Sequence, residues 1–405
     1  MRKIRWILVC GALGLTATEM GAQEVLTFDR YLHRVGQQNL EYMATRLNVD
    51  IADAEVVAAK VVPDPSLDFE AARDNFVLGI SYALELGKRR ARVQAAKTER
   101  DLEKLALEGS FQDLRAQSAE LFLEAILQKE LLLVKEESYT YMKSLSTSDS
   151  LRFAAGEITE NDARQTRLEA VSLQNEVYEQ EAAFRSALVE LNRFMGLDSD
   201  TLLSPSGNWE HLERDFRLND LLSLGREVRP EILMASKNRE VQEKNYRLVK
   251  AERRPDIDLS LSYERDWNHF LPQARLATLG VSVPLTFSHL NKGELKSARL
   301  KTQQAEIGYR DTELQVLAEI RQSWFGFEAE RKKVAQYRTG ILDESRKVLE
   351  GMVYKYKRGE ATVLDVLVSQ RTYNEVRQDY LETMKGYVSS LVTLERSCGF
   401  WDIHF

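Results

Sequence analysis

The chain has 405 residues, of which 29% are charged and 43% hydrophobic, and its formal net charge is −7. This acidic balance gives no electrostatic argument for nucleic-acid binding, because a phosphate backbone is recognised by excess positive charge. No segment after residue 23 contains 18 uncharged apolar residues, so the sequence predicts no transmembrane helix, and any insertion into a membrane would have to use strands.

The N-terminal segment, residues 1–23, has the layout of a secretory signal peptide. Basic residues come first, an apolar stretch follows, and small residues form a cleavage region. A membrane anchor is the alternative, but the apolar stretch is far shorter than the roughly 20 residues that span a bilayer. Cys10 is expected to be lost with this segment, which leaves Cys398 alone and excludes an internal disulfide.

The first half of the mature chain, residues 24–197, is expected to contain a helix, a strand pair, a long helix, a tight turn and a return helix. The first helix is predicted over 26–61, where prolines end it, and the strand pair over 66–86. A proline-free stretch predicts the long helix over 88–145, about 85 Å in length. Such a helix is not stable alone, so we expect a coiled coil or helical bundle.

A linker over 198–217 precedes a second half, residues 218–405, that follows the same order. A helix is expected over 218–253, a strand pair over 256–287 and a long helix over 293–353, again followed by a turn and a return helix. The linker contains proline, glycine and asparagine and is too short to be a domain.

The two halves are copies of each other. Residues 152–162 align without a gap on residues 355–365, and the offset of 203 residues (359 minus 156 for the shared glycine) holds to the end of both halves. Apolar residues keep helical spacing in both copies. The chain is therefore predicted to be a tandem duplication of one helical unit.

The predicted strands alternate between large apolar residues on one face and small or charged residues on the other. In the second strand, the apolar positions recur at every second residue from Phe76 to Leu86. A soluble sheet would also alternate, but strand lengths of about 8 to 11 residues match a tilted membrane-spanning strand. An open sheet of this size would leave backbone groups without partners in lipid, so the chain is expected to oligomerise.

Carboxylates occupy polar positions in these strands. If this face lines water, they would form an acidic lumen that favours cations, whereas ordinary hydrated carboxylates are the alternative. The residues concerned are Asp68, Glu70, Glu85, Asp258 and Glu264. A basic run follows the second strand, either close to lipid headgroups or as the solvated start of a helix; it consists of Lys88, Arg89, Arg90 and Arg92.

These features resemble the TolC-type outer-membrane efflux proteins over nearly the whole mature chain. The resemblance rests on a duplicated Gly-x-x-Thr-x-x-Asp turn, on the run 358–367, and on the run 82–89, which looks most like the heavy-metal (CzcC/CusC-like) branch. It implies a mainly α fold with a small β part. Three copies would form a 12-stranded β-barrel continuous with a periplasmic α-helical barrel, placing the protein in the outer membrane with a large periplasmic portion.

The resemblance also implies a function and partners. The protein would be the outer-membrane channel of a tripartite efflux or type I secretion system. Its partners would be two further copies, a periplasmic adaptor, an inner-membrane pump of RND or ABC type and the lipid bilayer, with no nucleic acid, no cofactor and no metal site. Heavy-metal cations are one candidate cargo, and the sequence leaves the transported substrate open.

Two turns are implied to be the tips that dock the adaptor. Their residues are Gly156, Glu157, Thr159 and Asp162 in the first copy and Gly359, Glu360, Thr362 and Asp365 in the second. Physically, the glycines suit a turn and the aspartates suit the first turn of a helix, so a purely structural cap is the alternative. Tyr356 and Asp365 match the periplasmic entrance, but a second acidic position is Val368 here and a basic one is Ala361.

An enzyme is disfavoured as an alternative function. The chain has five His residues, none paired at helical spacing, and it lacks a phosphate-binding loop or a nucleophile elbow. A periplasmic coiled-coil adaptor or a structural protein is the second alternative. Adaptors also carry long hairpins, but they are not expected to carry two copies that each end in an amphipathic strand pair.

Overall fold

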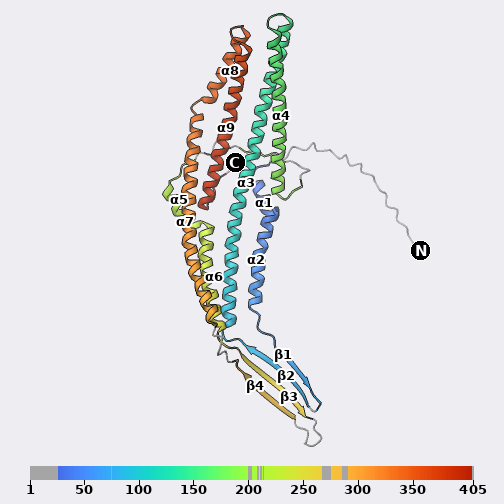
Figure 1. Cartoon of the computed structure of the whole chain (residues 1–405), viewed down its shortest axis with the longest axis vertical. Helices are drawn as coiled ribbons and strands as arrows, with labels where there is room; N and C mark the ends of the chain where they lie inside the picture. Colours follow the sequence, from blue (N-terminus) through green and yellow to red (C-terminus); the bar gives the residue numbers. More distant parts are fainter. Residues whose placement is uncertain are drawn as a thin grey trace, which may run out of the picture.

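The computed structural model of the chain describes residues 26–73, 75–198, 203–207, 209, 212, 214–266, 275–284 and 291–403. The predicted signal peptide over 1–23 and the predicted strand residues 285–287 lie outside them. The described part is elongated, with long helices running side by side to two hairpin tips at one end and a small sheet at the other (Figure 1).

The first repeat begins with two helices rather than the single predicted helix over 26–61. α1 (Phe28–Gln38) ends at Asn39, and α2 (Leu40–Ala59) starts directly after it. The Asn39 side chain accepts the backbone N–H of Tyr42 at 2.9 Å and donates to the carbonyl of Phe194 at 3.0 Å. The break is therefore made by a buried asparagine that caps α2 and anchors it to the body of the repeat.

The strands and the long helix of the first repeat follow in the predicted order. β1 (Ser66–Ala71) and β2 (Asn75–Leu84) lead into α3 (Lys88–Ala154), and α4 (Glu160–Phe194) returns. The predicted end of the long helix at 145 is wrong, because α3 continues to Ala154. The whole helix has 67 residues and is about 100 Å long. Serine and threonine residues near the C-terminal end of α3 do not end the helix, because their hydroxyls donate to backbone carbonyls four residues earlier. The Ser150 hydroxyl, for example, donates to the carbonyl of Ser146 at 2.8 Å.

The second repeat also starts with a divided helix. α5 (Leu218–Val228) and α6 (Pro230–Glu252) replace the predicted helix over 218–253. Arg229 between them has an extended backbone, which is the conformation that a residue before proline prefers, and Pro230 starts the next helix.

The second long helix is also divided. β3 (Ile257–Asp266) and β4 (Arg275–Ser282) are followed by α7 (Lys292–Tyr337), α8 (Ile341–Lys357) and α9 (Val363–Cys398). The predicted continuous helix over 293–353 is thus wrong. Gly340 precedes α8 with φ of 102°, a left-handed conformation that a glycine adopts without steric cost.

The four strands form one antiparallel sheet in the order β1-β2-β3-β4. Leu78 pairs with Phe69 on one side and Tyr263 on the other, and Gly79 pairs with Asp68 and Ser262. Because neighbouring partners share a face, the register confirms that the large apolar residues lie on one face of the sheet. The carboxylates Asp68, Glu70, Asp258 and Glu264 share the opposite face. Glu85 is not part of this set of strand residues, because β2 ends at Leu84.

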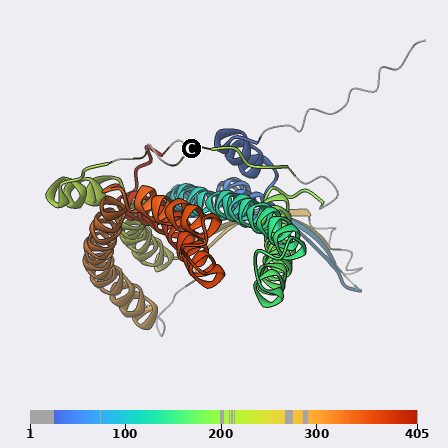
Figure 2. The same cartoon turned by 90° about the horizontal axis from the view of Figure 1, so that it is seen from above.

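Below the tips, the helices are held by a large apolar core at mid-length. It includes Tyr31 of α1, Phe122 of α3, Leu191 of α4 and Leu394 of α9, all fully buried. Seen end-on, the helices lie along a curve (Figure 2). No helix in the described part of the chain combines the length and apolarity needed to cross a membrane.

Candidate functional site: the hairpin tips

The two hairpin tips have the same backbone. Gly156 has φ of 78° and Gly359 has φ of 75°, and both close the preceding helix with the same hydrogen bonds. The amide of Glu157 donates to the carbonyl of Arg152 at 2.9 Å, and the amide of Glu360 donates to that of Lys355 at 2.9 Å. The left-handed residue that ends each helix is therefore a glycine for a steric reason.

Each return helix begins with a capping box. The amide of Asp162 donates to the Thr159 hydroxyl oxygen at 3.2 Å, and the amide of Asp365 donates to that of Thr362 at 3.2 Å. In return, each aspartate accepts the amide of its threonine, and donation from Thr362 lowers the pKa of Asp365 below its usual range. The predicted position of both aspartates in the first turn of a helix is confirmed.

The glutamates of the two turns form ion pairs within the chain, while apolar groups remain exposed. Glu157 pairs with Arg152 at 3.3 Å, and Glu360 pairs with Arg358 at 3.2 Å. Large apolar side chains near both turns stay exposed to solvent: Leu151, Phe153, Leu168, Leu364 and Val368. The tips thus offer an apolar surface with ordered charges at its rim.

A buried hydrogen bond joins the two hairpins just below their tips. The Tyr356 hydroxyl of α8 donates to Asp149 Oδ1 of α3 at 3.0 Å. Asp149 is fully buried, and the guanidinium of Arg152 lies 3.6 Å from its carboxylate and over the Tyr356 ring. Burial raises the pKa of Asp149 and also that of Tyr356. We call Asp149, Arg152 and Tyr356 the inter-repeat latch.

Sequence reasoning identified Tyr356 and missed its two partners. The available signal was an acidic residue on the apolar face that carries Met142 and Leu145, since Asp149 follows them at helical spacing. The structure does not join Tyr356 to Asp365, with which the sequence grouped it. Tyr356 is buried between the hairpins, whereas Asp365 caps α9 at the surface.

The predicted lumen residues lie at the other end of the molecule. Asp68 accepts a hydrogen bond from Ser81 at 3.3 Å, and Glu264 accepts one from Asn75 at 3.4 Å. Glu85 instead forms a two-point ion pair with Arg92 at 2.8 and 3.1 Å. The carboxylate of Glu85 therefore fastens α3 to the sheet.

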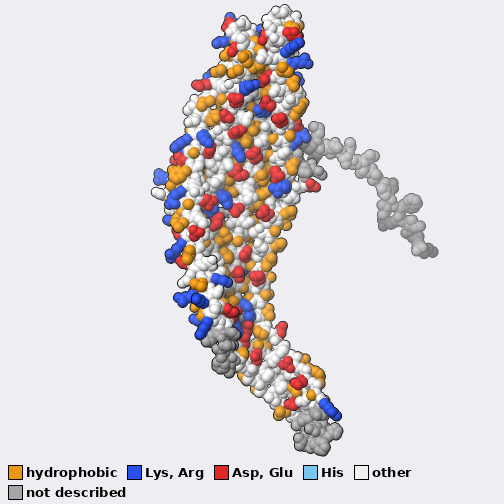
Figure 3. All heavy atoms as spheres, viewed as in Figure 1, with side chains coloured by type: hydrophobic (Ala, Val, Ile, Leu, Met, Phe, Trp, Pro, Cys, Tyr) orange, Lys and Arg blue, Asp and Glu red, His pale blue; other side chains and the backbone are white. Residues whose placement is uncertain are grey.

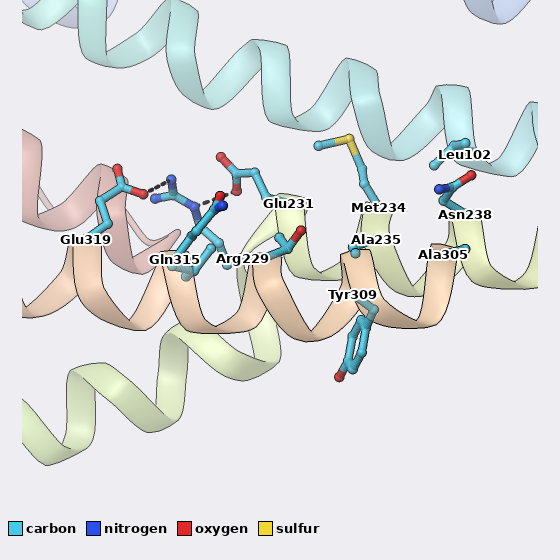
Figure 4. A pocket seen from close by; sticks show the side chains of 13 residues that line it. Leu102, Arg229, Glu231, Met234, Ala235, Asn238, Ala305, Tyr309, Gln315 and Glu319 are labelled. Atoms are coloured by element: carbon cyan, nitrogen blue, oxygen red, sulfur yellow. Dashed lines mark hydrogen bonds and ion pairs between the residues drawn. The ribbon is translucent and has the colours of Figure 1, made fainter. Parts of the chain in front are cut away.

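A groove of about 510 Å³ lies between α3, α6 and α7, and its charged lining residues, Arg229, Glu231 and Glu319, pair with one another (Figure 4). Arg229 is buried and donates to Glu231 at 2.5 Å, to Glu319 at 2.9 Å and to the carbonyl of Arg396. Its guanidinium is thus committed to protein partners. Within the described ranges, no three His, Cys, Asp or Glu side chains are placed to hold a metal ion.

Comparison with known proteins agrees with this geometry. The profile of the family "Outer membrane efflux protein" matches residues 221–399. The chain is 26% identical over 383 residues to the cobalt-zinc-cadmium resistance protein CzcC of Cupriavidus metallidurans, covering 92% of this chain and 90% of that protein. It is 24% identical over 322 residues to the proteases secretion protein PrtF of Dickeya chrysanthemi, covering 76% and 69%. The solved structure of CusC superposes with a TM-score of 0.75 at 15% identity, covering 93% and 92%.

The duplicated helical hairpin, with a four-stranded sheet at the end opposite its tips, is the fold that this chain shares with CusC. The chain is similar to the outer-membrane efflux protein family over residues 221–399, and to CzcC over 92% of its length. It is therefore an outer-membrane protein with a large periplasmic helical portion.

Proposed function

We propose that the chain is the outer-membrane channel of a tripartite efflux system that exports divalent metal cations. The observation that carries this proposal is the similarity to CzcC along 92% of the chain. The acidic face of the sheet supports the cargo, because Asp68, Glu70, Asp258 and Glu264 would surround a shared pore and attract cations. Catalysis has no role in this proposal.

The open edges of the molecule support assembly into a ring. β1 and β4 are the edge strands of the sheet. The helices connected to the strands contact one another in the same order as the strands: α2, α3, α6 and α7. Both edge helices expose apolar stripes to solvent: Leu40, Leu47, Ile51 and Val57 on α2, and Leu300, Ile307 and Leu314 on α7. The α7 residues are spaced by seven, as in a coiled-coil seam.

Two different edges that fit each other generate a closed ring when one contact is repeated around an axis. With three copies, as in the family resemblance, β4 of one copy would pair with β1 of the next to give 12 strands. This closure would remove the open sheet edges that lipid does not tolerate. The units repeated in each copy would be residues 24–197 and 218–405, joined by the linker over 198–217.

The tips would dock the periplasmic adaptor, through which the channel meets the inner-membrane pump. The exposed apolar side chains beside Gly156 and Gly359 support this assignment, because the glutamates of these turns are already paired within the chain. Glu157, Thr159 and Asp162, with Glu360, Thr362 and Asp365, would hold the tips in shape. The inter-repeat latch would keep the two hairpins together at the periplasmic entrance.

Ion selectivity in planar bilayers tests the proposal. The purified protein should form pores that prefer cations over anions, because the carboxylates face the water. A variant with Asp68→Asn, Asp258→Asn and Glu264→Gln should lose most of that preference while keeping its pores. A control with Glu181→Gln, an exposed carboxylate on α4, should keep it. Equal selectivity in all three proteins would contradict the cation assignment.

A further inference from the structure

Exposed basic side chains gather where the helices join the sheet. They lie at the end of α2, the start of α3, the end of α6 and the start of α7, and we call them the basic collar: Lys60, Arg89, Arg90, Arg254, Lys292 and Lys296. Figure 3 shows Lys and Arg side chains grouped at this lower end of the helices. Because these four helices follow the order of the strands, the collar extends across the whole width of the sheet.

The collar has few acidic neighbours. Arg89 donates one N–H to the carbonyl of Lys60 at 2.7 Å, which leaves most of its guanidinium exposed. No carboxylate of the described residues forms an ion pair with a collar side chain. The ion pairs at this level are made by the neighbouring Lys88 and Arg92. Exposed carboxylates at the same level are fewer than the basic groups: Asp64, Glu252 and Glu294.

The first turn of α3 shows which way the collar faces. Lys88 pairs with Asp256 at 2.7 Å, and Arg92 pairs with Glu85 at 2.8 Å. Asp256 and Glu85 each lie an even number of residues from the polar residues of the adjoining strand. Because side chains two residues apart in a strand point to the same side, both carboxylates lie on the side of the polar sheet face. At 3.6 residues per turn, Arg90 lies about 160° to 200° around the helix from both Lys88 and Arg92. Arg90 therefore lies on the side of the apolar sheet face.

The length of the strands determines the depth at which the collar would lie in a membrane. β2 and β3 have 10 residues each, which is about 33 Å of strand. A tilt of about 40° reduces this to roughly the 25 Å apolar band of an outer-membrane protein. With the apolar face in lipid, the collar then lies at the depth of the phosphates in the leaflet nearest the helices.

We propose that the basic collar binds the phosphate groups of anionic phospholipids in that leaflet. This inference rests on the proposed function, because it requires the sheet to be inserted in the membrane. Guanidinium groups suit phosphate oxygens, with which they form paired hydrogen bonds. Basic side chains near an anionic membrane surface strengthen binding on the order of fivefold each. The collar would thus fix the depth and angle at which the long helices leave the membrane.

Spin-labelled lipids test the collar directly. The full-length protein is reconstituted in phosphatidylcholine vesicles with a trace of spin-labelled phosphatidylglycerol or phosphatidylcholine, and the fraction of motionally restricted label is measured. We expect restricted phosphatidylglycerol to exceed phosphatidylcholine severalfold in the unmodified protein. The ratio should fall close to one in a variant with Lys60→Gln, Arg89→Gln, Arg90→Gln and Lys292→Gln.

A matched control removes the same number of exposed charges far from the sheet. The variant Arg164→Gln, Arg185→Gln, Arg346→Gln and Arg371→Gln should keep the lipid preference of the unmodified protein. An equal loss in this control would overturn the collar assignment, as would an unchanged ratio in the collar variant. Competition by inorganic phosphate, but not by chloride at equal ionic strength, would show a free-ion site instead of a lipid site.

Vesicle flotation separates failure of this inference from failure of the proposed function. If the protein floats with vesicles in high salt but shows no preference for phosphatidylglycerol, only the collar assignment is wrong. If it does not remain with vesicles at all, the sheet is not a membrane element and the proposed channel fails as well.

Discussion

The long arms of the two repeats differ in continuity, although they occupy equivalent places. α3 runs without a break for 67 residues, whereas its counterpart is divided into α7 and α8. Gly340 at the break corresponds, at the offset of 203, to Glu137 in the middle of α3, which pairs with Arg377 of α9 at 2.5 Å. The arm with glycine at this position is therefore divided, and the arm with a residue that is compatible with a helix is continuous.

This difference gives the two tips different support. The first tip stands on α3, which also packs along α6 and α9. The second tip stands on α8, which packs mainly on α9 and is tied to α3 by the Tyr356–Asp149 hydrogen bond. We infer that the second tip is the one whose position depends on the inter-repeat latch.

One difference between the buried cores of the repeats is a titratable group on α9. Glu395 of α9 corresponds to Asn192 of α4 at the same offset, and both side chains are fully buried. The Glu395 carboxylate accepts the amide of Asp402 at 2.8 Å, near Arg115 and Arg214. Burial raises the pKa of Glu395 to about 7. The second repeat thus contains a pH-dependent group where the first has a neutral amide.

The largest effect is expected from a β-branched residue at a tip. No atom lies within 4 Å of an added Cβ at Gly156 or Gly359, so Val would be disfavoured by the positive φ alone. Gly359→Val should abolish adaptor co-purification and metal efflux while leaving assembly intact, and Gly156→Val tests the same point in the first tip. Failure to assemble would make the turns structural caps. Normal efflux by Gly359→Val would leave only the first tip as a contact.

Glu395 predicts a pH dependence at a position where the first repeat has the neutral Asn192. Its ordinary pKa is 4.5 and its folded pKa is about 7, so the fold favours the protonated carboxyl. The free energy of unfolding should therefore fall as pH rises from 4.5 to about 7 and then level off, by about 3 kcal/mol in all. Urea titrations in detergent should show this slope.

Matched variants separate Glu395 from other titrating groups. Glu395→Gln should remove most of the slope in unfolding free energy. Asn192→Asp should add a slope of the same sign from the first repeat, because it introduces a buried carboxyl at the equivalent site. An unchanged slope in Glu395→Gln would assign the pH dependence to a different residue.

The latch is expected to matter more for the second tip than for the first. Tyr356→Phe leaves the buried Asp149 without its phenolic donor, which should cost about 1 to 3 kcal/mol locally. Hydrogen exchange should therefore become faster in α8 and the start of α9 but change little in α4. Equal acceleration in both hairpins would show that the latch supports the two tips alike.

The smallest effect is expected at the joint itself. Gly340→Ala places a side chain at φ of 102° and should cost about 1 to 2 kcal/mol of stability. The reciprocal change, Glu137→Gly, should cost about 1 kcal/mol by weakening the continuous α3. Thermal unfolding of both variants measures these costs. No loss in Gly340→Ala would mean that the joint adopts a different backbone in solution.

The repeats, the two faces of the sheet and the turn caps could be predicted because each depends on local pattern. Helical spacing located the arms, alternation set the sheet faces, and the Gly-x-x-Thr-x-x-Asp signature placed both capping boxes. The break at Asn39 was missed because the hydrogen bond that anchors it, from the Asn39 side chain to the carbonyl of Phe194, depends on packing and not on local sequence. The breaks at Arg229 and Gly340 have local signals, a following proline and the glycine itself, which were not used in the prediction. The latch was missed in part because Asp149 and Tyr356 are brought together only by packing of the two repeats.

Cysteine accessibility tests most directly the central claim that the polar face of the sheet lines a water-filled channel. Ser81→Cys and Ser260→Cys, which pair directly across β2 and β3, should react with membrane-impermeant thiol reagents and resist lipid-phase quenchers. Ile80→Cys and Leu259→Cys, on the opposite face, should behave in the reverse way. If the Ile80 and Leu259 positions are instead the water-accessible ones, the sheet faces are inverted and the channel assignment is contradicted.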